Sequence, residues 1–179
     1  RNITIASGRT LTIQSGDTLD SDGSVLNNGT IVFNTTSYLI VEGDFENTNG
    51  SITESTSTLV LDGISGQTLT TGGVTASDDF YNITIDNTGG IVSLSGNILI
   101  LGDFTISNGT FDAVSSDMTV YQGWSNSGTF TAGSGTVTFD APSAGPFDIN
   151  SGGSSFNNVT INSANENNVQ RLTSALDIN

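Results

Sequence analysis

The chain of 179 residues carries 18 acidic side chains, three basic ones and no histidine, which gives a formal net charge of −15. Nucleic acids and anionic membrane surfaces attract cationic patches, so this charge excludes nucleic acid as a partner and argues against membrane binding. No apolar run is long enough to span a bilayer, and we therefore expect no membrane insertion. Cysteine is absent as well, which removes disulfides and thiolate metal sites.

The composition favours strands over helices. The chain contains 22 glycines and is rich in Ser, Thr and Asn, residue types that weaken helix interiors. No segment keeps apolar residues at the i, i+3, i+4, i+7 spacing of an amphipathic helix. The sequence thus predicts an all-β fold.

Short apolar segments repeat along the chain. Their start positions differ by 20, 40, 20 and 18 residues, which indicates a unit near 20 with one degenerate copy between residues 63 and 97. The segments are Ser37–Gly43 (SYLIVEG), Ser57–Gly63 (STLVLDG), Asn97–Asp103 (NILILGD), Asp117–Gly123 (DMTVYQG) and Gly135–Ala141 (GTVTFDA).

A second repeated element is a glycine turn followed by a β-branched or aromatic segment. It occurs at Asn28-Gly29, Asn49-Gly50, Asn108-Gly109 and Ser127-Gly128. Such a pair supplies the positive φ of a tight turn. Each unit is therefore interpreted as turn, strand, turn, strand.

Alignment of the segments predicts two inward columns, because residues two apart on a strand share a face. One column comprises Val41, Leu61, Leu101, Tyr121 and Phe139. The other comprises Leu39, Leu59, Leu99, Thr119 and Val137.

The fixed period with matching columns predicts a parallel β-helix, or β-solenoid, with coils of about 20 residues. Residues 1–179 are expected to form a single solenoid domain, or a slice of a longer array. Tandem immunoglobulin-like β-sandwiches are the alternative, since many short strands with regular turns also suit that fold.

The adjacent pair Asp78-Asp79 is the candidate for paired catalytic carboxylates, as in β-helical polysaccharide hydrolases. Hydrolases of that fold also carry basic residues near the acids, whereas this chain has no His or Lys and its three arginines lie near the termini. We interpret the pair as a solvated turn and expect no enzyme activity.

Acidic residues also suggest a calcium site. Asp17-x-x-Asp20-x-Asp22-Gly23 partly resembles a calcium loop, although the EF-hand spacing fails, and Asp44 belongs to a second acidic cluster. We favour charged, solvated turns here, with no cofactor; calcium at Asp20, Asp22 and Asp44 is the alternative.

Two further features bear on ligands. Trp124 stands where other units have Asp-Phe; it is either a core substitute for Phe or an exposed platform for a sugar ring. Thr-x-Thr pairs resemble those of ice-binding proteins, but they do not share one position of the unit.

The amino-acid sequences of the repeats resemble those of known surface proteins. Trp124–Phe139 (WSNSGTFTAGSGTVTF) and Ser155–Ile161 (SFNNVTI) are similar to repeat regions of very large bacterial cell-surface adhesin and filament proteins, especially those of Bacteroidota. The resemblance implies secretion to the cell surface and a structural or adhesive role.

The expected function is that of an extracellular structural protein whose ends stack on further solenoid. No cap is recognised, and strands are expected at both extremes, with Ile3 and Ile5 at one end and Leu176 and Ile178 at the other. Open edges of this kind invite strand pairing, with neighbouring repeats or with another copy. A carbohydrate-binding adhesin module, with surface polysaccharide as its partner, is the alternative.

Overall fold

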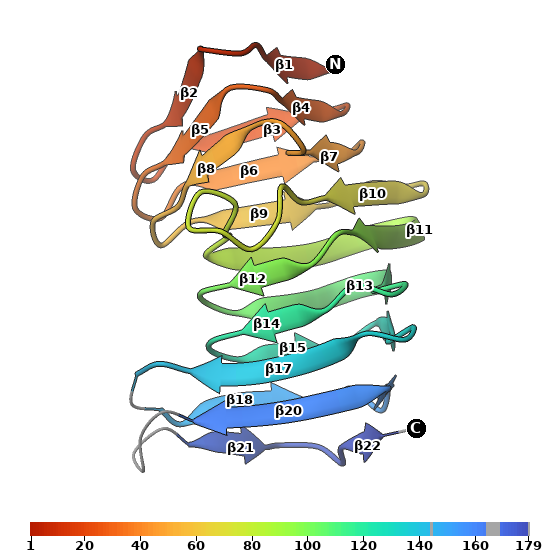
Figure 1. The fold of residues 1–179 in the computed structure, drawn as a ribbon. Helices are drawn as coiled ribbons and strands as arrows, with labels where there is room; N and C mark the ends of the chain where they lie inside the picture. Colours follow the sequence, from red (N-terminus) through yellow and green to blue (C-terminus); the bar gives the residue numbers. More distant parts are fainter. Residues whose placement is uncertain (144, 164–168, 179) are drawn as a thin grey trace.

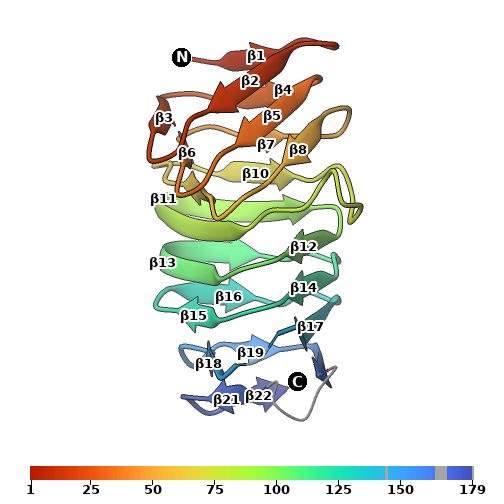
Figure 2. The ribbon, with the colours of Figure 1, turned by 90° about the vertical axis from the view of Figure 1, so that its left-hand side faces the viewer.

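The strands of this chain pair in parallel, each with a strand about one coil further along the sequence. The computed structural model describes residues 1–143, 145–163 and 169–178, and among these it contains strands and turns but no helix. The coils are about 21 residues apart and number about eight, so the fold is a β-solenoid. Figures 1 and 2 show a narrow stack with the two termini at opposite ends. Immunoglobulin-like sandwiches are excluded, because their sheets are antiparallel.

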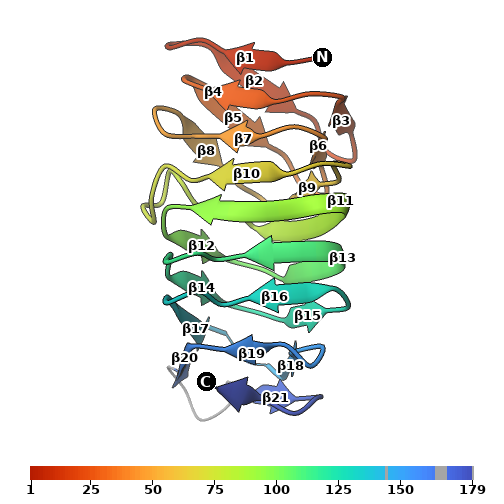
Figure 3. The same cartoon turned by 90° about the vertical axis from the view of Figure 1, so that its right-hand side faces the viewer.

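Each coil contributes strands to three faces. Face 1, which Figure 3 shows from β1 downwards, is built from β1 (Ile3–Ile5), β4 (Val25–Asn27), β7 (Phe45–Glu46), β10 (Gln67–Thr70), the second halves of β11 (Asn82–Ser95) and β13 (Phe104–Asp112), β16 (Thr129–Thr131), β19 (Ser155–Phe156) and β22 (Asp177–Ile178).

Face 2 is built from β2 (Thr10–Ile13), β5 (Thr30–Phe33), β8 (Ser51–Thr53), β12 (Ile98–Ile100), β14 (Met118–Val120), β17 (Thr136–Ala141) and β20 (Asn158–Ser163). Face 3 is built from β3 (Thr18–Ser21), β6 (Tyr38–Val41), β9 (Thr58–Leu61), the first halves of β11 and β13, β15 (Trp124–Asn126), β18 (Phe147–Asn150) and β21 (Gln170–Leu172). The unit therefore has three strands, not the two that the repeat alone suggested.

The pairing register corrects the predicted columns beyond residue 61. Leu59 and Leu61 pair with Ile83 and Ile85 on face 3, so they do not continue into β12. On face 2 the buried residues that pair with Val137 and Phe139 are Met118 and Val120, and before them Ile98 and Ile100. Leu99, Leu101, Thr119 and Tyr121 are thus one residue out of phase and lie only half-buried. A one-residue slip moves every side chain to the opposite face.

Aromatic side chains gather inside the C-terminal half of the stack. Trp124 is 1% exposed, and its ring centroid lies 4.6 Å from that of Phe104 and 4.9 Å from that of Phe130. Phe139 and Phe156 complete this aromatic cluster at 6.0 and 5.3 Å. Edge-on and tilted contacts of this kind stabilise cores beyond simple burial.

Amide side chains fill the corners where backbone groups would otherwise be unpaired. Asn27 Oδ1 accepts from Gly29 N at 3.1 Å, and its Nδ2 donates to Asn47 of the next coil. At another corner, Asn87 Nδ2 donates to Oε1 of Gln67 at 2.7 Å, while its Oδ1 accepts from Gly90 N. These polar contacts between coils satisfy the buried turns.

Glycine at the repeated turns is required mainly by close approach between coils. Of the four predicted turn glycines, Gly109 has positive φ, at 79°. At Gly128 a Cβ would collide with the backbone oxygen of Gly109, and at Gly29 it would meet the oxygens of Arg9 and Ala6. The expectation of positive φ was therefore wrong at Gly29, Gly50 and Gly128.

Candidate functional site: the two open ends

The N-terminal end presents three strands whose outer edges have no partner among the described residues. β1, β2 and β3 each pair with one strand of the second coil, β4, β5 and β6 respectively. Ile5 is buried at 5% exposure and Ile3 is half-buried, so both predicted end residues lie on the core side of the first coil.

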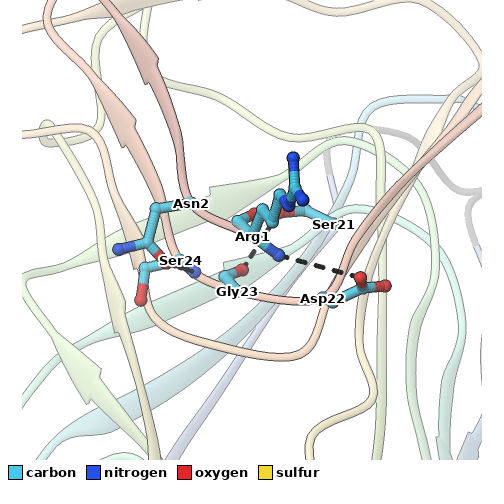
Figure 4. A network of polar contacts seen from close by, with 6 residues as sticks. All are labelled: Arg1, Asn2, Ser21, Asp22, Gly23 and Ser24. Atoms are coloured by element: carbon cyan, nitrogen blue, oxygen red, sulfur yellow. Dashed lines mark hydrogen bonds and ion pairs between the residues drawn. The ribbon is translucent and has the colours of Figure 1, made fainter.

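A polar network ties the first residues to the following corner (Figure 4). Ser21 Oγ donates to the carbonyl of Arg1 at 3.0 Å, and Ser24 N donates to Oδ1 of Asn2 at 3.0 Å. The N-terminal amine lies 3.8 Å from Asp22, but both partners are highly exposed, so this ion pair contributes little.

The C-terminal end exposes core positions. Ile161, Leu172 and Ile178 are in register with the inward residues Phe139, Ile149 and Phe156, yet they are 52%, 54% and 53% exposed. Among the described residues, this end therefore combines strand edges that have no partner with exposed apolar side chains at core positions.

The sequence-predicted residues at this end fall in two classes. Ile178 is exposed at the end, whereas Leu176 is half-buried and packs against the core. Sequence reasoning missed Ile161 and Leu172. The signal for Ile161 was present, since the repeated segment 156–161 matches residues 80–85, in which Ile85 is a core residue.

The calcium candidates do not converge. Asp20 points outward on β3, Asp22 lies beside the N-terminal amine, and Oδ1 of Asp44 accepts from Thr68 N at 2.7 Å. Among the described residues, no group of three acidic, His or Cys side chains is arranged to hold a metal ion.

Carboxylates do stack along one corner of the first coils. Asp22, Glu42, Asp62 and Asp86 follow the paired residues Ser21, Val41, Leu61 and Ile85 in successive coils. Burial, together with repulsion from Asp20, Glu42 and Asp86, raises the pKa of Asp62 above its ordinary value. Among the described residues, Asp22 has the exposed N-terminal amine as an ion-pair partner and the other three carboxylates have none, so the corner carries net negative charge.

Asp78 and Asp79 are buried rather than solvated, which corrects the prediction of a solvated turn. They are 8% and 5% exposed, in the loop that replaces a face 2 strand between β10 and β11. Asp78 Oδ2 accepts from Thr75 Oγ1 at 2.5 Å, whereas Oδ1 of Asp79 has no hydrogen-bond partner among the residues that the structure describes. Burial, Glu54 and Asp78 raise the pKa of Asp79 to about 6.

Trp124 is not a surface platform for sugars. Its 1% exposure and its place in the aromatic cluster remove the stacking face that a sugar ring would need, so the predicted glycan contact is wrong for this side chain. In the pairing of β13 with β15, Trp124 lies opposite Phe104. This position agrees with the other interpretation of Trp124, in which it replaces a core Phe of the repeat.

The Thr-x-Thr pairs are spread over different faces. Thr10 and Thr12 lie on face 2 in β2, whereas Thr68 and Thr70 lie on face 1 in β10. They do not line up as one flat array.

Comparison with protein-family models, with curated proteins and with solved structures gives no match. The described part of the chain includes no helix long and apolar enough to cross a membrane.

Proposed function

We propose that this chain is a structural segment of an extracellular, cell-surface filament or adhesin stalk that lengthens by stacking of solenoid coils end to end. The observation that carries the proposal is the uncovered core at Ile161, Leu172 and Ile178 beside open strand edges. A parallel coil placed there would bury these side chains and continue three sheets. The occupant is thus a further β-solenoid coil.

Composition and resemblance support the extracellular part of the proposal. A surface of charge −15 favours solubility, and the absence of Cys leaves nothing for an oxidising compartment to crosslink. The repeats resemble those of large bacterial surface adhesins, as the segments Trp124–Phe139 and Ser155–Ile161 illustrate. The role is non-enzymatic in this proposal, because neither His nor Lys is present to activate a nucleophile.

Sedimentation of the purified chain over a wide concentration range tests the stacking, with negative-stain electron microscopy of the same samples, with and without a calcium chelator. We expect concentration-dependent growth into rods that are longer than one chain. Leu172→Asp and Ile178→Asp should abolish growth, because a charge at the end cannot be buried unpaired.

Ile64→Asp is the matched control. Ile64 is an apolar side chain with 80% exposure on the flank, away from the ends, so its replacement should leave assembly unchanged. A chain that stays monomeric up to about 1 mM, or one that assembles equally well with Leu172→Asp, would overturn the proposal.

A further inference from the structure

A groove lies on face 3 near the C-terminal end of the stack. Its volume is about 530 Å³, within the range of ligand sites in proteins. It runs over β13, β15 and β18, and its lining includes Asp103, Gln122 and Phe147. Nothing in the end-to-end proposal uses this surface.

The groove lies where the corner between faces 2 and 3 becomes longer than in the preceding coils. Ile100 and Phe104, and likewise Val120 and Trp124, are four positions apart where face 2 passes into face 3. The equivalent pair in the next coil, Phe139 and Ile149, is ten positions apart. Insertions into a repeat commonly build its binding face.

Part of this longer corner forms a wall of the groove. Pro146 and Phe147 line it, and Phe147 N donates to the carbonyl of Val169 at 2.8 Å, which fixes the wall to the following coil. The ring of Phe147 is half-buried, so part of its surface stays accessible.

The floor is a ladder of outward polar side chains. Thr105, Ser125, Asn150 and Thr173 occupy equivalent positions on β13, on β15, on β18 and just after β21. Within the described part of the chain, the hydroxyls of Thr105 and Ser125 have no hydrogen-bond partner. Successive rungs are about 4.8 Å apart along the axis.

The second wall adds a carboxylate and an amide. Asp103 Oδ1 accepts from Gly123 N at 2.8 Å, and Gln122 Nε2 donates to Tyr81 Oη at 3.3 Å. These bonds orient the two side chains and leave Oδ2 of Asp103 and Oε1 of Gln122 as acceptors.

The charged side chains at the groove indicate which charge its ligand can carry. Arg171 donates to Asp148 through Nε at 2.6 Å and through Nη2 at 2.8 Å, so this cation is already paired. Asp103 has no cationic partner in the described residues. A site with one uncompensated carboxylate disfavours an anionic ligand.

We infer that this groove binds a neutral oligosaccharide, with hydroxyl groups on the Thr105–Ser125–Asn150 ladder and Asp103, and with one sugar face against Phe147. Hydroxyls, amides and carboxylates match the hydrogen-bonding groups of a sugar, and the C–H face of a pyranose packs on an aromatic ring. The inference is independent of end-to-end stacking, so either can fail without the other.

Titration of the intact chain with cellohexaose, laminarihexaose, xylohexaose and mannohexaose tests the site, with hexagalacturonate as the anionic comparator. The sole tryptophan, Trp124, lines the groove from beneath, so its fluorescence reports occupancy beside calorimetry. We expect saturable binding of at least one neutral hexasaccharide below about 10 mM and none of hexagalacturonate.

Phe147→Ala and Ser125→Leu should each weaken that binding at least about tenfold, because one removes the stacking surface and the other fills the floor. Thr12→Leu, at an outward position of β2 on another face, is the matched control and should bind like the parent chain. Circular dichroism of each variant checks the fold. Absence of binding to all four neutral glycans, preference for hexagalacturonate, or binding unchanged by Phe147→Ala and Ser125→Leu would overturn the inference.

Discussion

Nδ2 of Asn27 donates a 2.7 Å hydrogen bond to Oδ1 of Asn47 one coil further along the axis, and neither side chain is exposed to solvent. The same Nδ2 donates to the carbonyl of Ser51, while Oδ1 of Asn27 accepts from Gly29 N. One side chain therefore links its own turn to the next coil. Corners of a solenoid leave backbone groups unpaired, and buried amides of this kind satisfy them.

Replacement of Asn27 by Ala should destabilise the chain by about 1–3 kcal/mol, because the buried Asn47 Oδ1 and the N–H of the half-buried Gly29 would both lose this partner. The free energy of unfolding from urea titration measures the loss. Asn28→Ala is the control: among the described residues, the side chain of Asn28 makes one long hydrogen bond, 3.5 Å from Nδ2 of Asn49, at the surface. Equal effects of the two substitutions would contradict the structural role of the buried amide.

Trp124→Ala should lower the free energy of unfolding by about 3–5 kcal/mol, since it leaves a cavity in the middle of the aromatic cluster. Trp124→Phe should cost far less. Within the described ranges, the buried indole Nε1 of Trp124 has no hydrogen-bond partner. Phe removes that group and restores the residue type of Phe104 in the same column. Thermal and urea unfolding of both variants give the comparison; similar losses for Phe and Ala would argue against a tightly packed cluster.

The stability of the chain should depend on pH through Asp79. Its pKa in the folded chain, about 6, lies above the ordinary 3.8, because burial and the nearby Glu54 and Asp78 disfavour the charge. Because the folded chain holds the proton of Asp79 more tightly than the unfolded chain does, protonation of this carboxyl favours the folded state. That contribution to the free energy of unfolding is lost as pH rises from about 4 through 6. Between pH 4 and 7 the free energy of unfolding of the parent chain should thus fall by about 1–3 kcal/mol relative to that of Asp79→Asn.

Urea titrations of the parent and Asp79→Asn at several pH values measure this difference. The other acidic residues are present in both chains, so their contributions to the pH dependence cancel when the two free energies of unfolding are subtracted. Asp117→Asn, at an exposed position, is the control and should track the parent. A parent-minus-variant difference that stays flat from pH 4 to 7 would refute the assignment to Asp79.

Gly128→Ala should destabilise the stack by roughly 2 kcal/mol or more, because the added methyl group would collide with the carbonyl of Gly109 in the preceding coil. Gly66→Ala is the matched control: its Cβ would come no nearer than 3.9 Å to another atom, and Gly66 is not among the residues of positive φ. Unfolding free energies of the two variants are compared. A tolerated Gly128→Ala would mean that the coils can move apart.

The fold was predictable from the sequence because the period of the repeats reports the length of a coil. Leu39 and Leu59, twenty positions apart, do stack in register. The prediction of which side chains point inward was wrong in the segment 98–101. All four residues there are apolar, so an alternation of apolar and polar residues cannot distinguish inward from outward positions. The third strand of each coil was missed for a related reason. These strands, such as β4 and β7 on face 1 and β15 and β18 on face 3, vary in length and sequence, so they gave no common motif.

The open ends were predictable in kind but not in detail. Strand-like residues at both extremes predicted strands that the structure places at β1, with Ile3, and at β22, with Ile178, whereas the place of Leu172 depends on pairing between β18 and β21, whose sequences share no repeat. The burial of Asp79 could not have been foreseen, because two adjacent acids read locally as a turn on the surface. The neighbours that bury them come from distant coils.

The hydrogen bonds between coils run along the length of the rod, and this sets how it responds to tension. A force applied between the two termini pulls the strands of an end coil away from the next coil, so the bonds break coil by coil rather than all at once. Each coil of about 21 residues would release on the order of 70 Å of chain. In the proposed stalk, extension would therefore occur in steps, and a sudden load would be absorbed by stretched polypeptide before the remaining coils unfold.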